Sequence, residues 1–217
     1  IPKTCPACKA DFVTKGAHQF CPNPVCPDRL REKLVYFVQT LDMDNIGRST
    51  VEMLLSKGYI HNLHDFLDFN FETLENEAGF GAKKIALMKA GFEKSKKESF
   101  KTVLSALGLE EIGPKAIEIL LEHGLTDLES LLKAVEEQSS EFFKSIHGIG
   151  ETTALAIIRH FKDPGLLALL QKLRSKGFQT SAEASQAISL SSKLEGTLWA
   201  VTGSFALTLG MTPDKHI

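Results

Sequence analysis

The chain has 217 residues, 43% of them hydrophobic, which is enough to bury one large core or two smaller ones. Its 25 Lys and Arg residues against 27 Asp and Glu residues give a formal net charge of −2, so any nucleic-acid binding must be local. A signal-peptide pattern and an apolar run of about 18 residues are both absent from the sequence, which predicts a cytoplasmic protein without membrane contact.

Four cysteines form two short-spaced pairs near the N-terminus, twelve residues apart: Cys5, Cys8, Cys21 and Cys26. Each pair can form a tight knuckle around a tetrahedral metal ion. We therefore expect residues 1–30 to form a zinc finger with structural Zn2+ and no open coordination position for catalysis. Two alternatives stay open: two disulfides, which suit a small secreted domain better, and His18 in place of one cysteine ligand.

Residues 31–180 are expected to form an all-helical domain. Residues 35–38 fit either a strand or a helix, whereas residues 46–162 follow a helical pattern almost throughout. Asn70 and Thr126 precede acidic first turns and are expected N-caps. Six glycines interrupt the pattern: Gly58, Gly79, Gly91, Gly108, Gly124 and Gly148. Several of them fit helix C-terminal caps.

An apolar residue followed by glycine heads a helical pattern four times. The glycines are 34, 32 and 37 residues apart, and the fourth and seventh residues after each are apolar. Each repeat therefore predicts a helix, a tight hairpin and a second helix. The four pairs are Ile46-Gly47, Phe80-Gly81, Ile112-Gly113 and Ile149-Gly150.

These repeats resemble the helix-hairpin-helix motif, a non-specific DNA-binding element whose hairpin is typically Gly, apolar residue, Gly. We number them hairpin 1 (residues 45–47), hairpin 2 (79–81), hairpin 3 (111–113) and hairpin 4 (148–150). Such a turn lets its N–H groups converge with the free donors of the following helix on a backbone phosphate. The expected DNA-binding residues are Gly79, Phe80, Gly81, Lys83, Lys84, Gly148, Ile149, Gly150, Thr152, Asn45, Gly47, Arg48, Gly113 and Lys115, with Arg159 further along its helix.

Two hairpins depart from the glycine pattern. Asn45 replaces the first glycine of hairpin 1 and tolerates a left-handed conformation. Glu111 brings a carboxylate to hairpin 3, which Lys115 could offset. We expect hairpins 2 and 4 to bind phosphate, and hairpins 1 and 3 chiefly to build the paired scaffold. The alternative for every repeat is that the glycine and the apolar residue only pack helix against helix.

The C-terminal segment differs from the helical region. After a leucine-rich helical run at 166–174, residues 181–193 are polar and are expected to form a linker. Residues 194–204 resemble the opening strand and phosphate-loop turn of a BRCT domain. Residues 194–217 are too few for such a domain, which predicts a truncated α/β start. The alternative is an ordinary strand or hairpin that completes the preceding domain.

The order of a four-cysteine finger, four helix-hairpin-helix motifs and a BRCT start, together with residues 42–47, resembles the C-terminal half of bacterial NAD-dependent DNA ligases. The resemblance implies a mainly α fold. It also implies a parent enzyme that moves adenylate from NAD to a lysine and then to the 5′-phosphate of a nick, and seals the nick with the 3′-hydroxyl during replication and repair. The family's adenylated lysine lies in a Lys-x-Asp-Gly motif that this sequence lacks. NAD and Mg2+ are therefore expected to bind the parent ligase only, and this chain is expected to have no catalytic or cofactor-binding residue and no activity alone.

The expected partners are nicked double-stranded DNA, bound without sequence preference, and the N-terminal adenylation and OB-fold domains of the same protein. The resemblance further implies a monomer in the bacterial cytoplasm, associated with the nucleoid. Another class of function stays open: a non-enzymatic DNA-binding adaptor, or a targeting module of a DNA repair nuclease. A DNA glycosylase is a third possibility, although it requires a catalytic aspartate in one hairpin. The coding sequence upstream of Ile1 discriminates among these.

Overall fold

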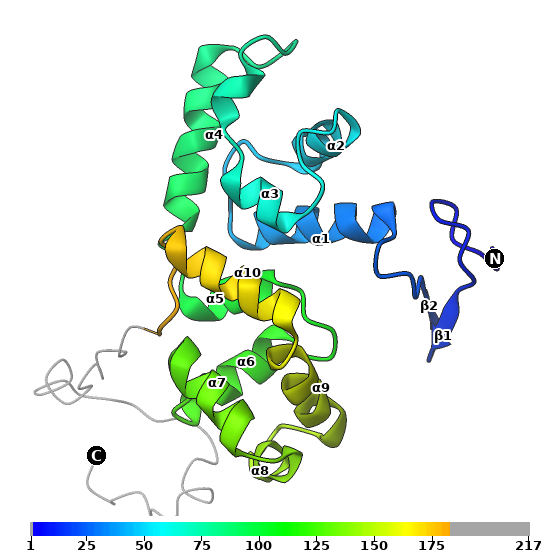
Figure 1. Cartoon of the computed structure of the whole chain (residues 1–217), viewed down its shortest axis with the longest axis vertical. Coiled ribbons are helices and arrows are strands. Elements are labelled where there is room, and N and C mark those ends of the chain that lie inside the picture. Colours follow the sequence, from blue (N-terminus) through cyan, green and yellow to red (C-terminus); the bar gives the residue numbers. More distant parts are fainter. Residues whose placement is uncertain (1, 183–217) are drawn as a thin grey trace, which may run out of the picture. The chain divides into compact units, whose positions relative to one another are not determined.

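The structure is a computed structural model that describes residues 2–182 (Figure 1). The chain divides into two compact units, Ile1–Glu183 and Ala184–Ile217, and the fold below is that of the first. The truncated BRCT start and nearly all of the predicted linker lie outside the described residues.

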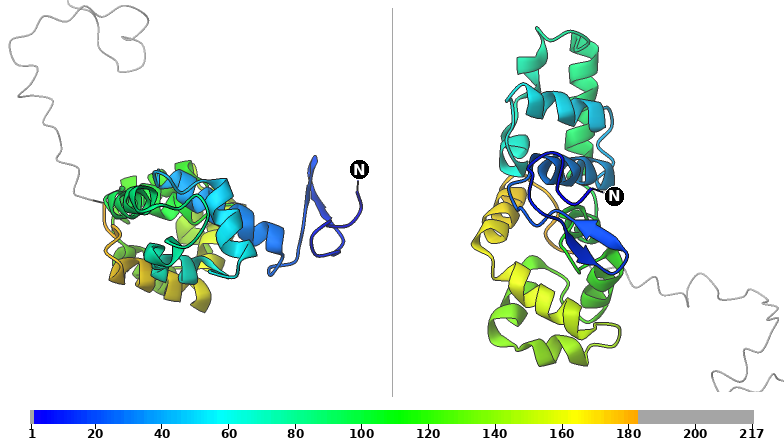
Figure 2. Two further views of the ribbon diagram at one scale, coloured as in Figure 1. Left: turned by 90° about the horizontal axis from the view of Figure 1, so that it is seen from above. Right: turned by 90° about the vertical axis from the view of Figure 1, so that its right-hand side faces the viewer.

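The N-terminal segment contains the two β-strands of the described region. Strands β1 (Val13–Lys15) and β2 (His18–Phe20) pair antiparallel, with Val13 opposite Phe20. Gly16, at φ +61°, allows the tight turn between them. Figure 2 shows that a loop connects this small ribbon to the first helix.

Helices make up most of the remaining described chain, which confirms the predicted mainly α fold. Residues 35–38, which fit a strand or a helix by pattern, lie in the first of them. Among residues 2–182 no helix is both long and apolar enough to cross a membrane. The helices are α1 (Pro27–Thr40), α2 (Arg48–Ser56), α3 (Leu63–Asp68), the 3-10 helix η1 (Phe71–Leu74), α4 (Ala82–Ser95), α5 (Phe100–Ala106), α6 (Pro114–Glu122), α7 (Leu128–Glu137), α8 (Ser140–Ser145), α9 (Glu151–Phe161) and α10 (Pro164–Ser175).

The helix caps confirm one expectation and correct another. The Asn70 side chain accepts a hydrogen bond from the Glu72 N–H and caps η1. The N-cap of α7 is Asp127 rather than Thr126, because the Asp127 carboxylate accepts from the Ser130 N–H at 2.7 Å and Ser130 Oγ accepts from the Asp127 N–H at 3.2 Å. The Thr126 carbonyl instead accepts from the N–H of Ala182, which ties the end of the described chain to the start of α7.

The interrupting glycines do not all end helices. Gly58, Gly108 and Gly124 have positive φ and directly follow α2, α5 and α6, as expected of C-terminal caps. Gly91 is different, since it is buried inside α4, and the expected interruption of the helical pattern there is wrong.

One buried cluster runs through the helical region, from Leu34 in α1 to Phe178 after α10. Helix α1 packs against α2 and α5, and α9 packs against α7, α8 and α10. Phe66, Phe92 and Phe178 form edge-to-face contacts at its centre, with ring centroids 5.9–6.1 Å apart. Burying each such ring stabilises the fold by about 1.5–3 kcal/mol relative to leaving it exposed.

Candidate metal centre and nucleic-acid interface

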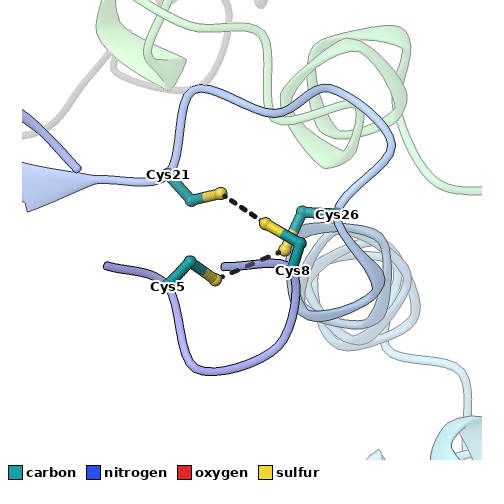
Figure 3. Close-up of side chains that lie close together, drawn as sticks. All are labelled: Cys5, Cys8, Cys21 and Cys26. Atoms are coloured by element: carbon teal, nitrogen blue, oxygen red, sulfur yellow. Dashed lines mark hydrogen bonds between the residues drawn. The ribbon is translucent and has the colours of Figure 1, made fainter. Parts of the chain in front are cut away.

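The four cysteines come together at the N-terminal end of α1. Their Sγ atoms all lie within 4.8 Å of one another and point toward a common centre (Figure 3). Cys5 and Cys8 flank one loop, Cys21 follows β2, and Cys26 is the N-cap residue of α1. The fold therefore assembles the pairs that the spacing predicts.

The sulfur distances fit a metal and not a disulfide. Cys5 and Cys26 Sγ lie 3.7 Å apart, and Cys8 and Cys21 Sγ lie 3.4 Å apart. A disulfide requires about 2.05 Å, whereas four thiolates about 2.3 Å from a tetrahedral zinc ion lie about 3.8 Å from one another. All four cysteines are free in the structure, which favours the metal site over the two disulfides.

The loop around the first pair favours the thiolate form of Cys8. The Cys5 N–H donates a hydrogen bond to the Ala10 carbonyl oxygen at 2.8 Å, and Lys9 adopts a left-handed φ of 63°. A hydrogen bond from the Ala10 backbone lowers the pKa of Cys8 to about 6. Desolvation beside the other thiols raises the pKa of Cys21 to about 12. A bound cation would favour the thiolate form of Cys21, because a metal ligand must be deprotonated.

All four hairpins have the same backbone conformation. The first residue of each is exposed and left-handed. Its φ is 64° at Asn45, 84° at Gly79, 66° at Glu111 and 93° at Gly148. The N–H of the following residue donates a hydrogen bond to the carbonyl oxygen three residues earlier, with N–O distances of 3.0–3.1 Å, and so closes a tight turn. The donors are Ile46, Phe80, Ile112 and Ile149. Replacing the first glycine by Asn or Glu therefore preserves the hairpin.

The last glycine of each hairpin is the N-cap of the helix that follows: Gly47 of α2, Gly81 of α4, Gly113 of α6 and Gly150 of α9. No side chain caps any of these four helices. The first N–H groups of each helix therefore remain available to an acceptor from outside the hairpin, at the positive end of the helix dipole.

Nothing within the described protein explains why these four residues are glycine. Their φ values lie between −100° and −72°, a range open to any residue. A Cβ added at any of them would meet no atom within 4 Å. The apolar residue before each glycine is buried, so that residue packs the helices together. The packing explanation accounts for the apolar residue but not for the glycine.

The cationic side chains near the hairpins are not equally available. Lys83 is exposed, and residues 2–182 contain no acidic partner for it. Lys84 Nζ lies 3.7 Å from the centre of the Phe80 ring. Arg48, by contrast, binds both Glu32 carboxylate oxygens at 2.7 Å, and Lys115 Nζ lies 2.9 Å from Glu118.

Two features of the hairpins were missed from the sequence. Pro114 is the first residue of α6, so hairpin 3 lacks one of the N–H donors that the other three helices provide. The proline is visible directly after Gly113 in the sequence. Hairpin 4 carries the exposed Thr152, but Glu151 opens its helix and lies 3.8 Å from Lys144.

A hollow of about 500 Å3 lies at hairpin 1. The turn residues 42–47 line it, together with Thr50 of α2 and Lys84 of α4. Lys84 follows hairpin 2 in the sequence, so groups from the first two hairpins share one hollow.

The comparisons with known proteins agree with this geometry. The family model for the SAM-like helix-hairpin-helix tandem matches residues 101–163, which contain hairpins 3 and 4. This part of the chain thus has the pattern of a tandem helix-hairpin-helix protein.

Curated relatives match nearly the whole chain, and each is named DNA ligase. A relative from Leptospira interrogans is 34% identical over 212 residues, which are 94% of this chain and 31% of the relative. Relatives from Leptospira biflexa and Borrelia recurrentis are 32% identical, again over 94% of this chain and 31% of their own lengths. The resemblance to bacterial DNA ligases is confirmed, and the chain spans about a third of these relatives.

Proposed function

We propose that this chain is the DNA-clamping portion of an NAD-dependent DNA ligase that seals nicks in duplex DNA. The observation that carries the proposal is the set of four exposed glycines at uncapped helix N-termini, where a Cβ would meet nothing in the protein. Glycine is needed at such positions if a ligand approaches the backbone closely.

Backbone N–H groups at helix N-termini suit phosphate, and they explain how a chain with a net charge of −2 binds DNA. Contacts to phosphate position a protein without reading bases, so binding has no sequence preference. Since few lysines take part, affinity falls with added salt on a shallow slope.

The hairpins differ in how well they suit phosphate. Hairpin 2 combines two glycines with the unpaired Lys83, and hairpin 4 combines two glycines with Thr152. Hairpin 3 is the least suited, because Pro114 removes a donor and Glu118 already holds Lys115. Hairpin 1 keeps all its donors, although Glu32 competes with phosphate for Arg48.

The four cysteines are proposed to hold one structural zinc ion. Four thiolates fill its tetrahedral shell, so the metal orders the finger and takes no part in catalysis. A segment of this size buries little apolar surface, and metal binding supplies much of its folding free energy.

The chemistry is proposed to reside in the rest of the protein. The sequence lacks Lys-x-Asp-Gly, and NAD and Mg2+ would bind to the adenylation and OB-fold domains. The parent would act in replication and repair in the cytoplasm, at the nucleoid, as a monomer with a BRCT domain after residue 194. Upstream coding sequence without Lys-x-Asp-Gly would favour an adaptor or a nuclease module instead.

Replacing Gly81 or Gly150 with valine tests the phosphate sites. Both positions are exposed and extended, so the fold is retained, while the side chain blocks the approach of a phosphate. Each substitution should weaken binding to a nicked duplex by about tenfold, irrespective of sequence, since a lost charge-assisted hydrogen bond costs about 1.5–3 kcal/mol. Binding is measured by fluorescence anisotropy.

The matched control is Gln138→Val, at an exposed and extended position after α7. It should bind as tightly as the unmodified chain. Unchanged affinity of both glycine variants, with an intact fold, would refute the proposed mode of binding.

A further inference from the structure

The residue before the left-handed position is held in the same way in hairpins 1 and 3. It is Asp44 in hairpin 1 and Glu110 in hairpin 3, and we call these the anchor residues. In each case a residue of the helix after the next hairpin lies close to the anchor's carbonyl oxygen, and a cation binds the anchor's carboxylate. Asp44 and Glu110 therefore occupy equivalent places in the two pairs of hairpins, although different residues contact them.

In the first pair, Gly91 of α4 lies against Asp44. A Cβ at Gly91 would lie 2.4 Å from the Asp44 carbonyl oxygen and 2.8 Å from the Asp44 nitrogen. Both atoms belong to the backbone, so the clash could not be relieved by turning a side chain. One turn further along α4, Lys94 Nζ binds Asp44 at 3.1 Å and Asp42 at 2.9 Å.

In the second pair, His160 of α9 takes the place of Gly91. Gly91 is ten residues after Gly81, and His160 is ten residues after Gly150. His160 Nε2 lies 3.1 Å from the Glu110 carbonyl oxygen and 3.2 Å from Arg159 Nη2. In the tautomer with the proton on Nε2, His160 donates a hydrogen bond to Glu110, since a carbonyl oxygen can only accept. The Glu110 carboxylate binds Arg29 at 2.8 Å.

We infer that Gly91 and His160 are positioning residues that set the spacing between the two hairpins of each pair, so that both reach phosphates of one duplex at once. This inference rests on the proposed function. Two sites on one rigid body reinforce each other because the second binds at a high effective concentration, and the gain disappears when the geometry is wrong. The hollow that Lys84 shares with hairpin 1 places groups of the first pair within common reach.

The test for the first pair is a double-mutant cycle with Gly91→Ala and Gly47→Val, read out as affinity for a nicked duplex. In the unmodified chain Gly47→Val should weaken binding by about tenfold, and in the Gly91→Ala chain by less than about twofold, because hairpin 1 is already displaced. Gly91→Ala alone should weaken binding, although alanine normally favours a helix.

The control is Ala90→Gly, at the neighbouring exposed position of α4. It destabilises the helix without touching Asp44, so the full effect of Gly47→Val should remain. An equal effect of Gly47→Val in the Gly91→Ala chain would show that Gly91 serves packing only and would overturn the inference. If neither Gly47→Val nor Gly81→Val weakens binding in any background, the proposed function itself fails.

The second pair is tested by conservative rescue. His160→Leu removes the donor to Glu110 and should weaken duplex binding by about threefold, a small effect because hairpin 3 is the least suited to phosphate. His160→Gln keeps an N–H donor at this place and should restore affinity. A His160→Leu chain that melts earlier yet binds DNA as before would overturn the assignment of His160.

Discussion

At the residue scale, glycine serves three purposes in this chain. At Gly79 and Gly148 it adopts a left-handed turn, at Gly91 it admits a backbone in close contact, and at Gly81 it leaves open space before an uncapped helix. The sequence shows only that glycine recurs. The structure distinguishes these roles. A Cβ added at Gly91 would meet backbone atoms of Asp44, whereas one added at Gly81 would meet no atom within 4 Å.

Replacing Glu111 with glycine should raise DNA affinity. Glu111 adopts a φ of 66°, a conformation that glycine adopts without strain, so the hairpin is retained. The change removes a carboxylate beside the N-terminus of α6, where a phosphate would bind. We expect tighter binding to a nicked duplex, measured by fluorescence anisotropy. An intact fold with unchanged affinity would contradict a bound phosphate at hairpin 3.

The ion pair between Glu32 and Arg48 gives a prediction for pH dependence. Hydrogen bonds from Arg48 lower the pKa of Glu32 to about 2, from an ordinary value near 4.5. A depressed carboxyl pKa contributes stability above the unfolded value, and this stability is lost as pH falls from about 5 toward 2. The stability difference between the native chain and Glu32→Gln should therefore shrink over this range, as followed by urea denaturation.

Glu32→Gln should also change DNA binding near neutral pH. Removing the carboxylate breaks the shorter ion pair of Arg48 and leaves only the one to Glu52 at 3.7 Å. Arg48 can then reach a phosphate at hairpin 1 more easily, so affinity for a nicked duplex should rise at low salt. Glu129→Gln is the control, because it releases Arg174 far along the sequence from any hairpin. Equal effects of the two changes would show that net charge alone is responsible.

At the element scale, much of the fold follows from the sequence. Helical periodicity predicts the helices after each hairpin, and the Cys spacing predicts the sulfur cluster. Strands β1 and β2 have three residues each, too few to show an alternating pattern. Helix α4 passes through Gly91 because tertiary packing against Asp44 outweighs the intrinsic cost of glycine, which no local pattern reveals. The contacts of the anchor residues Asp44 and Glu110 were missed for the same reason, since they also depend on tertiary packing.

The finger should depend on its metal. Metal analysis should find about one zinc ion per chain, and Cys21→Ser should lose both the ion and the order of the N-terminal segment. Since Cys26 is the N-cap of α1, the first turn of that helix should loosen as well. Nuclear magnetic resonance of the amide groups reports both changes. Metal-free chain with an unchanged spectrum would refute the site.

At the scale of the whole molecule, a chain with almost balanced charge repeats the same structural feature four times: a left-handed turn followed by a helix N-terminus that no side chain caps. Because the hairpins offer backbone N–H groups rather than lysines, the net charge does not indicate these sites. In the sequence, only the repeated pattern of an apolar residue and a glycine indicates them. The sequence could not rank the hairpins fully, since Glu118 and Glu32 act through contacts that depend on the fold. Pro114, by contrast, can be read from the sequence, because it lacks an N–H wherever it lies.

The central claim is that backbone N–H groups at the hairpins hold duplex phosphates. The most direct test is to titrate isotope-labelled chain with a nicked duplex and follow the amide proton signals of individual glycines. We predict downfield shifts that saturate together at Gly81 and Gly150, while Gly58 and Gly124, at helix C-terminal ends, remain unchanged. Saturable binding that leaves the Gly81 and Gly150 amide signals in place would contradict the account.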